Sequence, residues 1–452
     1  MKFNKLFAVV ASLFVLAACD SDDPPPPTVS TEDPTAFIQV LHASADAPPV
    51  DILVNDAIAI PDFDYKQGSG LVELDPGVEY QIAVSAQLPG DDAVVIGPVG
   101  LTFDAGTITT ISAVGNAAEI DANVFTQPDS NIALGNAEIS VLHAVPGVGE
   151  EVVVYATAVG ADLAASAPVG QFDFGGTLGP VEVPAGEYQI RAALESAPTV
   201  AIFDSGPVSL TATRLLVAAV PNTTGGNSPI SLTVLTSAGS VEIVDVSTPA
   251  VVRAVHNATD VPAVDIAAGG AVAIPNLTFE QGASDTIEVP GGTYPIEVAL
   301  EGQYPAGVAI GPVDLEFATG TVNTVVARGT LLNDDLNASQ LTEDTRSIAL
   351  YSKVRVFHGA STAPAVDVYL VAPGSTDLSG GPAIANLDYA ESSGFAAVPA
   401  GTYDAIVTLA GTETIAIGPA ALPALSNGDV VTVIARDPAQ GSDAFGVTLF
   451  AD

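Results

Sequence analysis

Short runs of apolar and β-branched residues, separated by turn residues, recur along the chain after its first 35 residues. Runs such as 107–114 and 321–328 are rich in Val, Ile, Thr and Ala. Clusters of Gly, Pro, Asn and Asp separate the runs, as they separate strands. No stretch of about 11 residues or more shows the 3.6-residue period of an amphipathic helix. The pattern predicts an all-β protein built from short strands.

The four histidines of the chain occur in one recurring context, which marks an internal repeat. Each histidine ends an apolar run and is followed by a turn containing Pro and Gly, then a tyrosine, then a Gly-Pro step. A repeat of roughly 100 residues is longer than the periods of solenoids, so it indicates tandem domains. The recurring residues are His42, His143, His256 and His358, and Tyr80, Tyr188, Tyr294 and Tyr403.

The spacing of these residues shows a second level of repetition. From histidine to tyrosine there are 38, 45, 38 and 45 residues in the four repeats, and the alternate histidines lie 214 and 215 residues apart. A two-domain unit was therefore duplicated whole, with an insertion in the second domain of each unit, near 158–167 and 373–381. The expected boundaries are 36–134 (A1), 135–248 (B1), 249–346 (A2) and 347–452 (B2).

Several short strands in each repeat are typical of a β-sandwich of the immunoglobulin type. The segment 74–80, which contains Pro76, Gly77 and Tyr80, resembles a tyrosine corner, whose hydroxyl bonds back to the backbone. We expect four tandem immunoglobulin-like β-sandwich domains in an A-B-A-B arrangement, with the four tyrosines in structural roles. The chain has no Trp, and small Val and Ala faces are expected to fill the space between the sheets.

The N-terminus reads as a bacterial lipoprotein leader. Lys2 and Lys5 precede a short apolar stretch, and the sequence Leu-Ala-Ala-Cys at 16–19 contains the only cysteine of the chain. It resembles the lipobox, in which the thiol is lipidated and cleavage leaves Cys19 as the first residue. We therefore expect a signal peptide over 1–18. A chain without an unmodified cysteine has no disulfide and no thiol chemistry.

An acidic, proline-rich segment, 19–35, follows the leader and is expected to be an extended tether. Two acyl chains give a stable anchor, and no later segment has 18 uninterrupted apolar residues. The expected location is the bacterial cell envelope, at the outer membrane or cell surface. The periplasmic face of the inner membrane is the alternative, because Asp20 resembles an inner-membrane retention signal.

The recurring motif also resembles a known family. The run H-x-(S/T)-x-x-(A/V)-P-x-V-D, followed by V-P-(A/G)-G-T-Y, is similar to the bacterial domain of unknown function number 4397, common in envelope lipoproteins. The resemblance covers nearly all of 36–452 and is close for repeats one, three and four. Repeat two departs from it at 145–151. The family carries no established activity, so the resemblance implies fold and location but no reaction.

The charge of the chain excludes one class of partner. There are 53 Asp and Glu against 11 Lys and Arg, a net charge of −42, and removal of Lys2 and Lys5 with the leader makes it −44. Nucleic acid is excluded as a partner, because phosphate binding needs basic patches. Apolar residues reach 48%, which argues against a disordered acidic chain.

The histidines are the residues on which an enzyme hypothesis would depend. Counting back by twos, each shares a strand face with aliphatic residues, whereas Gln39, Ser140, Arg253 and Arg355 lie on the opposite face. We therefore interpret all four histidines as structural core residues, with ring nitrogens bonded to backbone or to a hydroxyl. An Asp follows nine residues later at Asp51, Asp265 and Asp367, but repeat two has none.

No motif supports catalysis or a cofactor. The chain has no GxSxG elbow, no phosphate-binding glycine loop and no zinc-ligand spacing. Acidic clusters occur at 20–23, 91–92 and 334–335 without a calcium-loop spacing, so solvated surface charge is favoured over weak calcium binding. We expect no enzyme activity, no cofactor, no catalytic residue and no metal ligand.

An enzyme is the least supported of three classes of function, and two other classes remain. The favoured one is a non-enzymatic, lipid-anchored envelope protein that presents β-sandwich interaction domains to a protein or polysaccharide partner, in adhesion or scaffolding. The alternative is a periplasmic or surface binding module for a small solute, a glycan or a divalent cation. Aromatic residues make up only 6% and Trp is absent, which disfavours sugar stacking.

Overall fold

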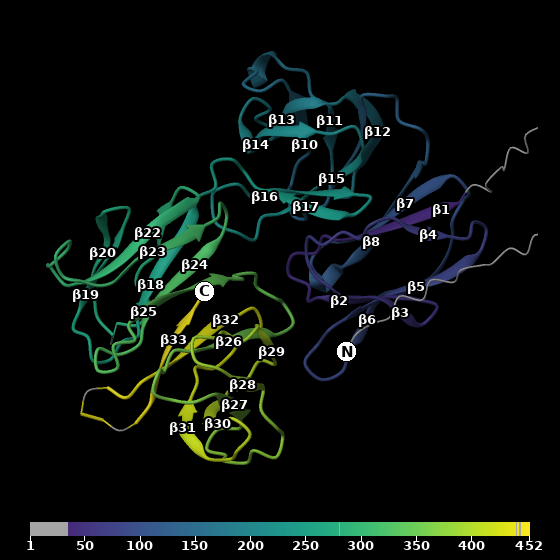
Figure 1. Ribbon diagram of the computed structural model, residues 1–452. Coiled ribbons are helices and arrows are strands. Elements are labelled where there is room, and N and C mark those ends of the chain that lie inside the picture. Colours follow the sequence, from purple (N-terminus) through teal and green to yellow (C-terminus); the bar gives the residue numbers. More distant parts are fainter. Residues whose placement is uncertain (1–34, 280, 440, 443) are drawn as a thin grey trace, which may run out of the picture. The chain divides into compact units, whose positions relative to one another are not determined.

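The computed structural model describes residues 35–279, 281–439, 441–442 and 444–452. The predicted signal peptide, Cys19 and the tether as far as residue 34 lie outside the described residues. The described chain is built from short strands, with two 3-10 helices, η1 (Ala117–Glu119) and η2 (Leu163–Ala165) (Figure 1). Its eight sheets are arranged in pairs, so the prediction of an all-β protein made of tandem β-sandwiches is confirmed.

A1 contains eight strands in two four-stranded sheets. One sheet has the order β4-β1-β7-β8 and the other the order β3-β2-β5-β6. In the first sheet β1 runs parallel to β7, while the other pairings are antiparallel. The strands are β1 (Ala36–His42), β2 (Val50–Val54), β3 (Ala57–Phe63), β4 (Val72–Leu74), β5 (Glu79–Ala86), β6 (Ala93–Thr102), β7 (Thr107–Val114) and β8 (Asp121–Pro128).

B1 repeats this arrangement with one additional strand. Its sheets have the orders β12-β9-β15-β16-β17 and β11-β10-β13-β14, and β9 runs parallel to β15. The predicted insertion near 158–167 forms the loop that contains η2. The strands are β9 (Asn136–His143), β10 (Val152–Thr157), β11 (Gly170–Phe172), β12 (Thr177–Pro184), β13 (Gly186–Leu194), β14 (Ala201–Leu210), β15 (Arg214–Pro221), β16 (Ile230–Thr236) and β17 (Gly239–Ile243).

A2 and B2 each contain eight strands with the strand order of A1. The sheets are β21-β18-β24-β25 with β20-β19-β22-β23, and β29-β26-β32-β33 with β28-β27-β30-β31. In A2 the strands are β18 (Ala250–His256), β19 (Val264–Ala268), β20 (Ala271–Leu277), β21 (Ile287–Val289), β22 (Gly292–Leu300), β23 (Val308–Phe317), β24 (Val322–Arg328) and β25 (Asn337–Glu343). In B2 they are β26 (Ser352–His358), β27 (Val366–Val371), β28 (Ile384–Leu387), β29 (Ala396–Val398), β30 (Asp404–Leu409), β31 (Ile415–Ala421), β32 (Val430–Arg436) and β33 (Gly446–Ala451).

The strand order adds a detail to the expected immunoglobulin-like sandwich. In an immunoglobulin constant domain the first strand lies beside the second, in a sheet ordered A-B-E-D. Here the first strand of each repeat pairs instead with the fourth strand and, in parallel, with the seventh strand. The two-sheet architecture is therefore as expected, while the order of the strands within the sheets differs from that of an immunoglobulin constant domain. Alternation of apolar residues selects the buried face of a strand but not its neighbours.

Each sandwich has its own apolar core between its two sheets. In A1 the core includes Ile38 and Val40 of β1 together with Ile52 of β2 and Val84 of β5, so that both sheets contribute. Equivalent clusters fill B1, A2 and B2. In the described residues, no helix has both the length and the apolar character needed to cross a membrane.

Candidate functional site: charged junctions between the sandwiches

The predicted histidines are buried and bonded to backbone. Nε2 of His42 donates to the carbonyl oxygen of Pro48 at 3.0 Å, and His256 and His358 make the same bond to Pro262 and Pro364. A carbonyl can only accept, so Nε2 carries the proton. Nδ1 of His42 then accepts from the amide of Ser44 at 3.4 Å. Each imidazole thereby joins the end of a strand to the loop that follows it.

Burial lowers the pKa of three of the four imidazoles. Burial lowers the pKa of His42 to about 4, although the bond to the Pro48 carbonyl acts to raise it. Burial also lowers the pKa of His143 and of His256. Repeat two again departs, because Gly149 stands where the other repeats have the accepting Pro, and Nε2 of His143 has no bonding partner. All four rings are enclosed, with 2% exposure or less, so a solvent-borne substrate does not reach them.

The aspartates nine residues after three of the histidines also close loops. Asp265 accepts from the amides of Asn276 at 2.9 Å and Gly302 at 2.8 Å, and Asp367 accepts from Asn386 and Gly411 at 2.7 and 2.8 Å. Asn276 has a φ of 50°, in the left-handed region, so the carboxylate stabilises a turn that few side chains adopt. The His–Asp spacing therefore reflects turn geometry and not a shared reaction.

The repeated tyrosines lie at the entry to one strand of each sandwich. The hydroxyls of Tyr188, Tyr294 and Tyr403 donate to the carbonyl four residues earlier, at 2.8, 2.8 and 3.0 Å. The hydroxyl of Tyr80 instead accepts from the amide of Asp75 at 3.2 Å. The bond back to local backbone is the one that a tyrosine corner makes.

The acidic clusters in the described residues serve local backbone. Asp335 accepts from the amide of Thr330 at 2.7 Å, and Asp92 accepts from Leu88 at 3.3 Å. No group of three or more His, Cys, Asp or Glu side chains with metal-binding geometry occurs in the part of the chain that the structure describes. The cluster at 20–23 lies outside that part.

Basic side chains form the most distinctive polar feature of the molecule. Nine of the 11 Lys and Arg lie in the described residues, none of them exposed, and eight contact a neighbouring repeat. The exception is Arg191, which bonds to Thr157 and Ala161 within B1. The eight are Lys66, Arg214, Arg253, Arg328, Arg346, Lys353, Arg355 and Arg436. In a chain this acidic, the scarce cations are concentrated at the junctions.

The junction between A1 and B1 is mostly neutral where it is deepest. Gln39 of β1 donates to the carbonyl of Thr236 in B1 at 2.7 Å, and Ser140 of β9 donates to Gln127 of A1 at 2.5 Å. Side chains of both repeats, among them Leu41 and Leu142, form an apolar cluster beside these bonds. At the edge of the junction, Lys66 pairs with Glu242 at 2.6 Å.

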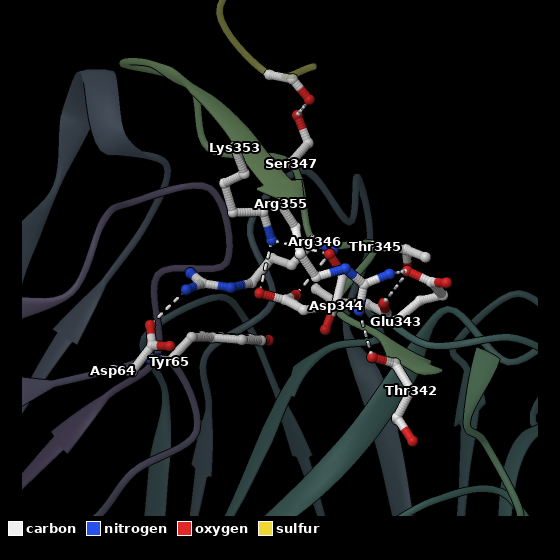
Figure 2. Close-up of polar contacts among 12 residues, drawn as sticks. Asp64, Tyr65, Thr342, Glu343, Asp344, Thr345, Arg346, Ser347, Lys353 and Arg355 are labelled. Atoms are coloured by element: carbon white, nitrogen blue, oxygen red, sulfur yellow. Dashed lines mark hydrogen bonds and ion pairs between the residues drawn. The ribbon is translucent and has the colours of Figure 1, made fainter. Parts of the chain in front are cut away.

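The junction between A2 and B2 is ionic at the same place. Glu343, at the end of β25, pairs with Arg355 of β26 and with Arg253 of β18, and all three side chains are buried. Arg253 also reaches Asp452 at 2.6 Å and lies over the ring of Phe450. Figure 2 shows Glu343 and Arg355 facing one another, with the Thr342 carbonyl accepting from Arg355 at 3.0 Å.

The segment that joins A2 to B2 also contacts A1. Arg346 pairs with Asp64 and donates to the carbonyl of Ala47 at 2.8 Å, while Asp344 pairs with Lys353 at 2.6 Å (Figure 2). The amide of Ala349 donates to the carbonyl of Asp46 at 2.8 Å. One connecting segment therefore links the second pair of repeats to the first.

A polar cavity of about 250 Å³ lies at this meeting point of A1, B1 and A2. Several threonines line it, together with six charged side chains. Each of those charges already has a partner: Asp64 with Arg346, Lys66 with Glu242, Asp344 with Lys353, and Glu343 with Arg355. Burial lowers the pKa of Lys66 and of Lys353 despite these partners. A site with no spare charge is suited to holding domains together and poorly suited to acid–base chemistry.

The sequence predicts structural roles for the histidines and the tyrosines, but it does not reveal the junctions. Strand alternation places Arg253 and Arg355 on the face opposite the histidines, and the neighbouring repeat covers that face. Their burial, at 6% and 4% exposure, is the sign that this face is not solvated. The signal in the sequence was three basic and two acidic residues crowded into 343–355 at a repeat boundary.

Comparison with known proteins gives a family but no activity. No curated protein matches the chain in sequence. A solved structure titled "The Bacillus anthracis TIE protein" is 11% identical over 90% of this chain and 75% of that one, with a TM-score of 0.14, too low to support an argument. The family described as "Domain of unknown function (DUF4397)" matches residues 36–155, 250–369 and 352–452. These stretches make up well over half of the sequence, and the protein belongs to that family.

Proposed function

We propose that this protein is a non-enzymatic scaffold of the bacterial cell envelope, anchored by a lipidated Cys19, whose sandwiches hold interaction surfaces in a defined arrangement. The observation that carries the proposal is the placement of eight basic side chains at junctions between repeats. Domains in one chain move relative to one another by default unless their interface is extensive. Apolar clusters shared by A1 and B1 and by A2 and B2, together with the hydrogen bonds and ion pairs around them, oppose that motion.

The lipobox at 16–19 and the acidic, proline-rich segment after it support the anchoring part of the proposal. Replacement of Cys19 by Ala is expected to move the protein from the membrane fraction to the soluble fraction. Unchanged partition into membranes would contradict lipid anchoring, without bearing on the scaffold.

The scaffold part is tested by distances between repeats. With Cys19→Ala the chain has no other cysteine, so spin labels can be placed at Val94Cys in A1 and Ile415Cys in B2, which are both exposed. Electron–electron double resonance is expected to give one narrow distance distribution. Arg346→Gln, which removes the ion pair with Asp64 and weakens the bond to Ala47, is expected to broaden it.

Arg191→Gln is the matched control, since Arg191 is the basic residue whose bonds stay within one repeat. It is expected to leave the distribution narrow. A broad distribution in the unsubstituted chain would contradict the scaffold, because independently moving sandwiches cannot hold surfaces in register.

A further inference from the structure

The sandwich of B1 contains a cavity of about 140 Å³ between its two sheets. Its walls are almost entirely aliphatic and aromatic, with Val154, Ile190, Phe203 and Leu232 among them. Val and Ala faces were expected to fill the space between the sheets, and here they do not. B2 contains a comparable apolar cavity of about 190 Å³, whereas the one in A1 measures about 80 Å³.

One position distinguishes B1 from the two A sandwiches. The residue at the end of the strand opposite the tyrosine corner is Phe103 in A1 and Phe317 in A2, and each ring packs against the corner tyrosine, 6.1 and 5.8 Å between centroids. B1 has Leu210 at that place, paired with Gly186 as Phe317 is paired with Gly292. Leu210 lines the cavity, so the smaller side chain leaves space that a ring fills in the A repeats.

The edge of the sandwich beside the cavity is irregular. β12 is an edge strand, and its register with β9 shifts between Leu178 and Val181, which marks a bulge. Val181 and Val169, from the edges of the two sheets, both line the cavity and are 41% and 42% exposed. These two valines therefore form a route from solvent into an otherwise enclosed space.

The chemistry of the walls selects the occupant. Tyr188 supplies a hydroxyl near the cavity, but that hydroxyl already donates to the carbonyl of Pro184 at 2.8 Å. Water needs about two to four polar partners to stay in a cavity, and an apolar cavity of about 150 Å³ stays dry and takes up benzene or xenon. A guest that carries a hydroxyl would lose hydrogen bonds to water without replacement.

We propose that the B1 sandwich binds one compact hydrocarbon group about the size of a benzene ring, which enters between Val169 and Val181. The group is either a small free hydrocarbon or the end of an alkyl chain. This binding goes beyond the proposed scaffold function and does not depend on it, because the site lies within a single sandwich.

The test uses the whole chain with Cys19→Ala, labelled with carbon-13 in its Leu and Val methyl groups. Benzene is expected to shift the methyl signals of Val181, Leu210 and Val217 along a saturable curve, which gives its dissociation constant. Phenol is expected to bind with an affinity at least tenfold lower. Saturable shifts with decanol as well would extend the site to chain ends. The absence of saturable shifts at these methyls with benzene would overturn the proposal.

Leu210→Phe installs the residue of the A repeats and is expected to weaken benzene binding in B1 at least tenfold. Val200→Phe adds the same ring at an exposed position of B1 and is the matched control, expected to leave binding unchanged. If Leu210→Phe prevents folding, Ala219→Val reduces the cavity from another wall and is expected to act in the same direction. Undiminished binding in a folded cavity-filling variant would also overturn the proposal.

Discussion

The two junctions within the duplicated pairs show equivalent positions filled by different chemistry. Gln39, Gln127 and Ser140 hold A1 to B1, and the matching positions in the second pair are Arg253, Glu343 and Arg355. All six side chains are buried. At these matched positions the first junction uses neutral hydrogen bonds, and its ion pairs Lys66–Glu242 and Arg214–Asp129 lie elsewhere, whereas the second must compensate three buried charges.

The apolar side chain beside these polar groups also differs between the two junctions. Where the first junction has Leu235, the second has Phe450, and the guanidinium of Arg253 lies 4.0 Å from its ring centre. An aromatic face attracts a cation that has been removed from water. A neutral network and an ionic network can therefore occupy the same interface. The ionic network depends on every member being present, because a buried charge without a partner is costly.

The largest expected effect is removal of the carboxylate at the centre of the second junction. Glu343→Ala leaves Arg253 and Arg355 buried without their shared partner, and we expect a loss of about 3–5 kcal/mol in the free energy of unfolding of the second pair. Gln127→Ala, the matched change in the first pair, is expected to cost about 1–3 kcal/mol. Chemical denaturation of the two variants measures both values.

A compensated variant separates charge from packing at the same site. Replacing Arg253, Glu343 and Arg355 by Gln, Gln and Ser, together with Asp452→Asn so that no carboxylate loses its partner, reproduces the neutral set of the first pair and is expected to recover most of the stability that Glu343→Ala loses. Equal costs for Glu343→Ala and Gln127→Ala would contradict the proposed difference between the junctions.

Acid should lower the free energy of unfolding of the first pair of repeats through His42. Burial lowers its pKa to about 4, below the value of about 6.5 of an unfolded chain, so the unfolded state binds more protons between these pH values. Stability is therefore lost as the pH falls from about 6.5 to about 4, by up to about 3 kcal/mol. His42→Gln should lose this part of the pH dependence. A native imidazole that titrates near pH 6.5 by NMR would contradict the prediction.

A smaller difference is expected between the histidines themselves. His256→Ala removes the partner of the Pro262 carbonyl and leaves a cavity, and is expected to cost about 1–3 kcal/mol in its sandwich. His143→Ala should cost less, because Nε2 of His143 has no bond to lose. Thermal unfolding with and without zinc measures both changes. A zinc-dependent rise in stability that either substitution abolishes would instead indicate a metal ligand.

The smallest effect is expected at the edge of the link between the pairs. Asp64 is 39% exposed in its pair with Arg346, so a double-mutant cycle of Asp64→Asn and Arg346→Gln should give a coupling of about 0.2–1 kcal/mol. About 0.5 M NaCl should reduce this coupling by screening. The coupling of Glu343 with Arg355 should persist in salt, because both side chains are buried. If salt reduced the Asp64–Arg346 and Glu343–Arg355 couplings equally, the proposed difference between an exposed and a buried ion pair would be contradicted.

Much of the architecture could be predicted because it is encoded locally. Strand alternation placed the histidines on apolar faces, and the spacing of histidines and tyrosines revealed the duplicated pair of domains. The parallel pairing of β1 with β7 could not be predicted, because these strands are far apart in sequence and alternation is silent about neighbours. The junctions could not be predicted for the same reason. Alternation separates the two faces of β18 and of β26, but it does not indicate that a neighbouring repeat covers the face opposite the histidines.

The placement of the basic residues has a consequence for handling the protein. Trypsin cleaves after Lys and Arg, and amine-reactive reagents modify Lys. In the described residues no Lys or Arg is exposed, and the two lysines, Lys66 and Lys353, have side chains only 11% and 7% exposed. The folded repeats therefore present almost no substrate to trypsin and almost no amine to a label. Shaving of intact cells to locate this protein needs a protease that cleaves after acidic or small residues, because a tryptic experiment would miss it even at the cell surface.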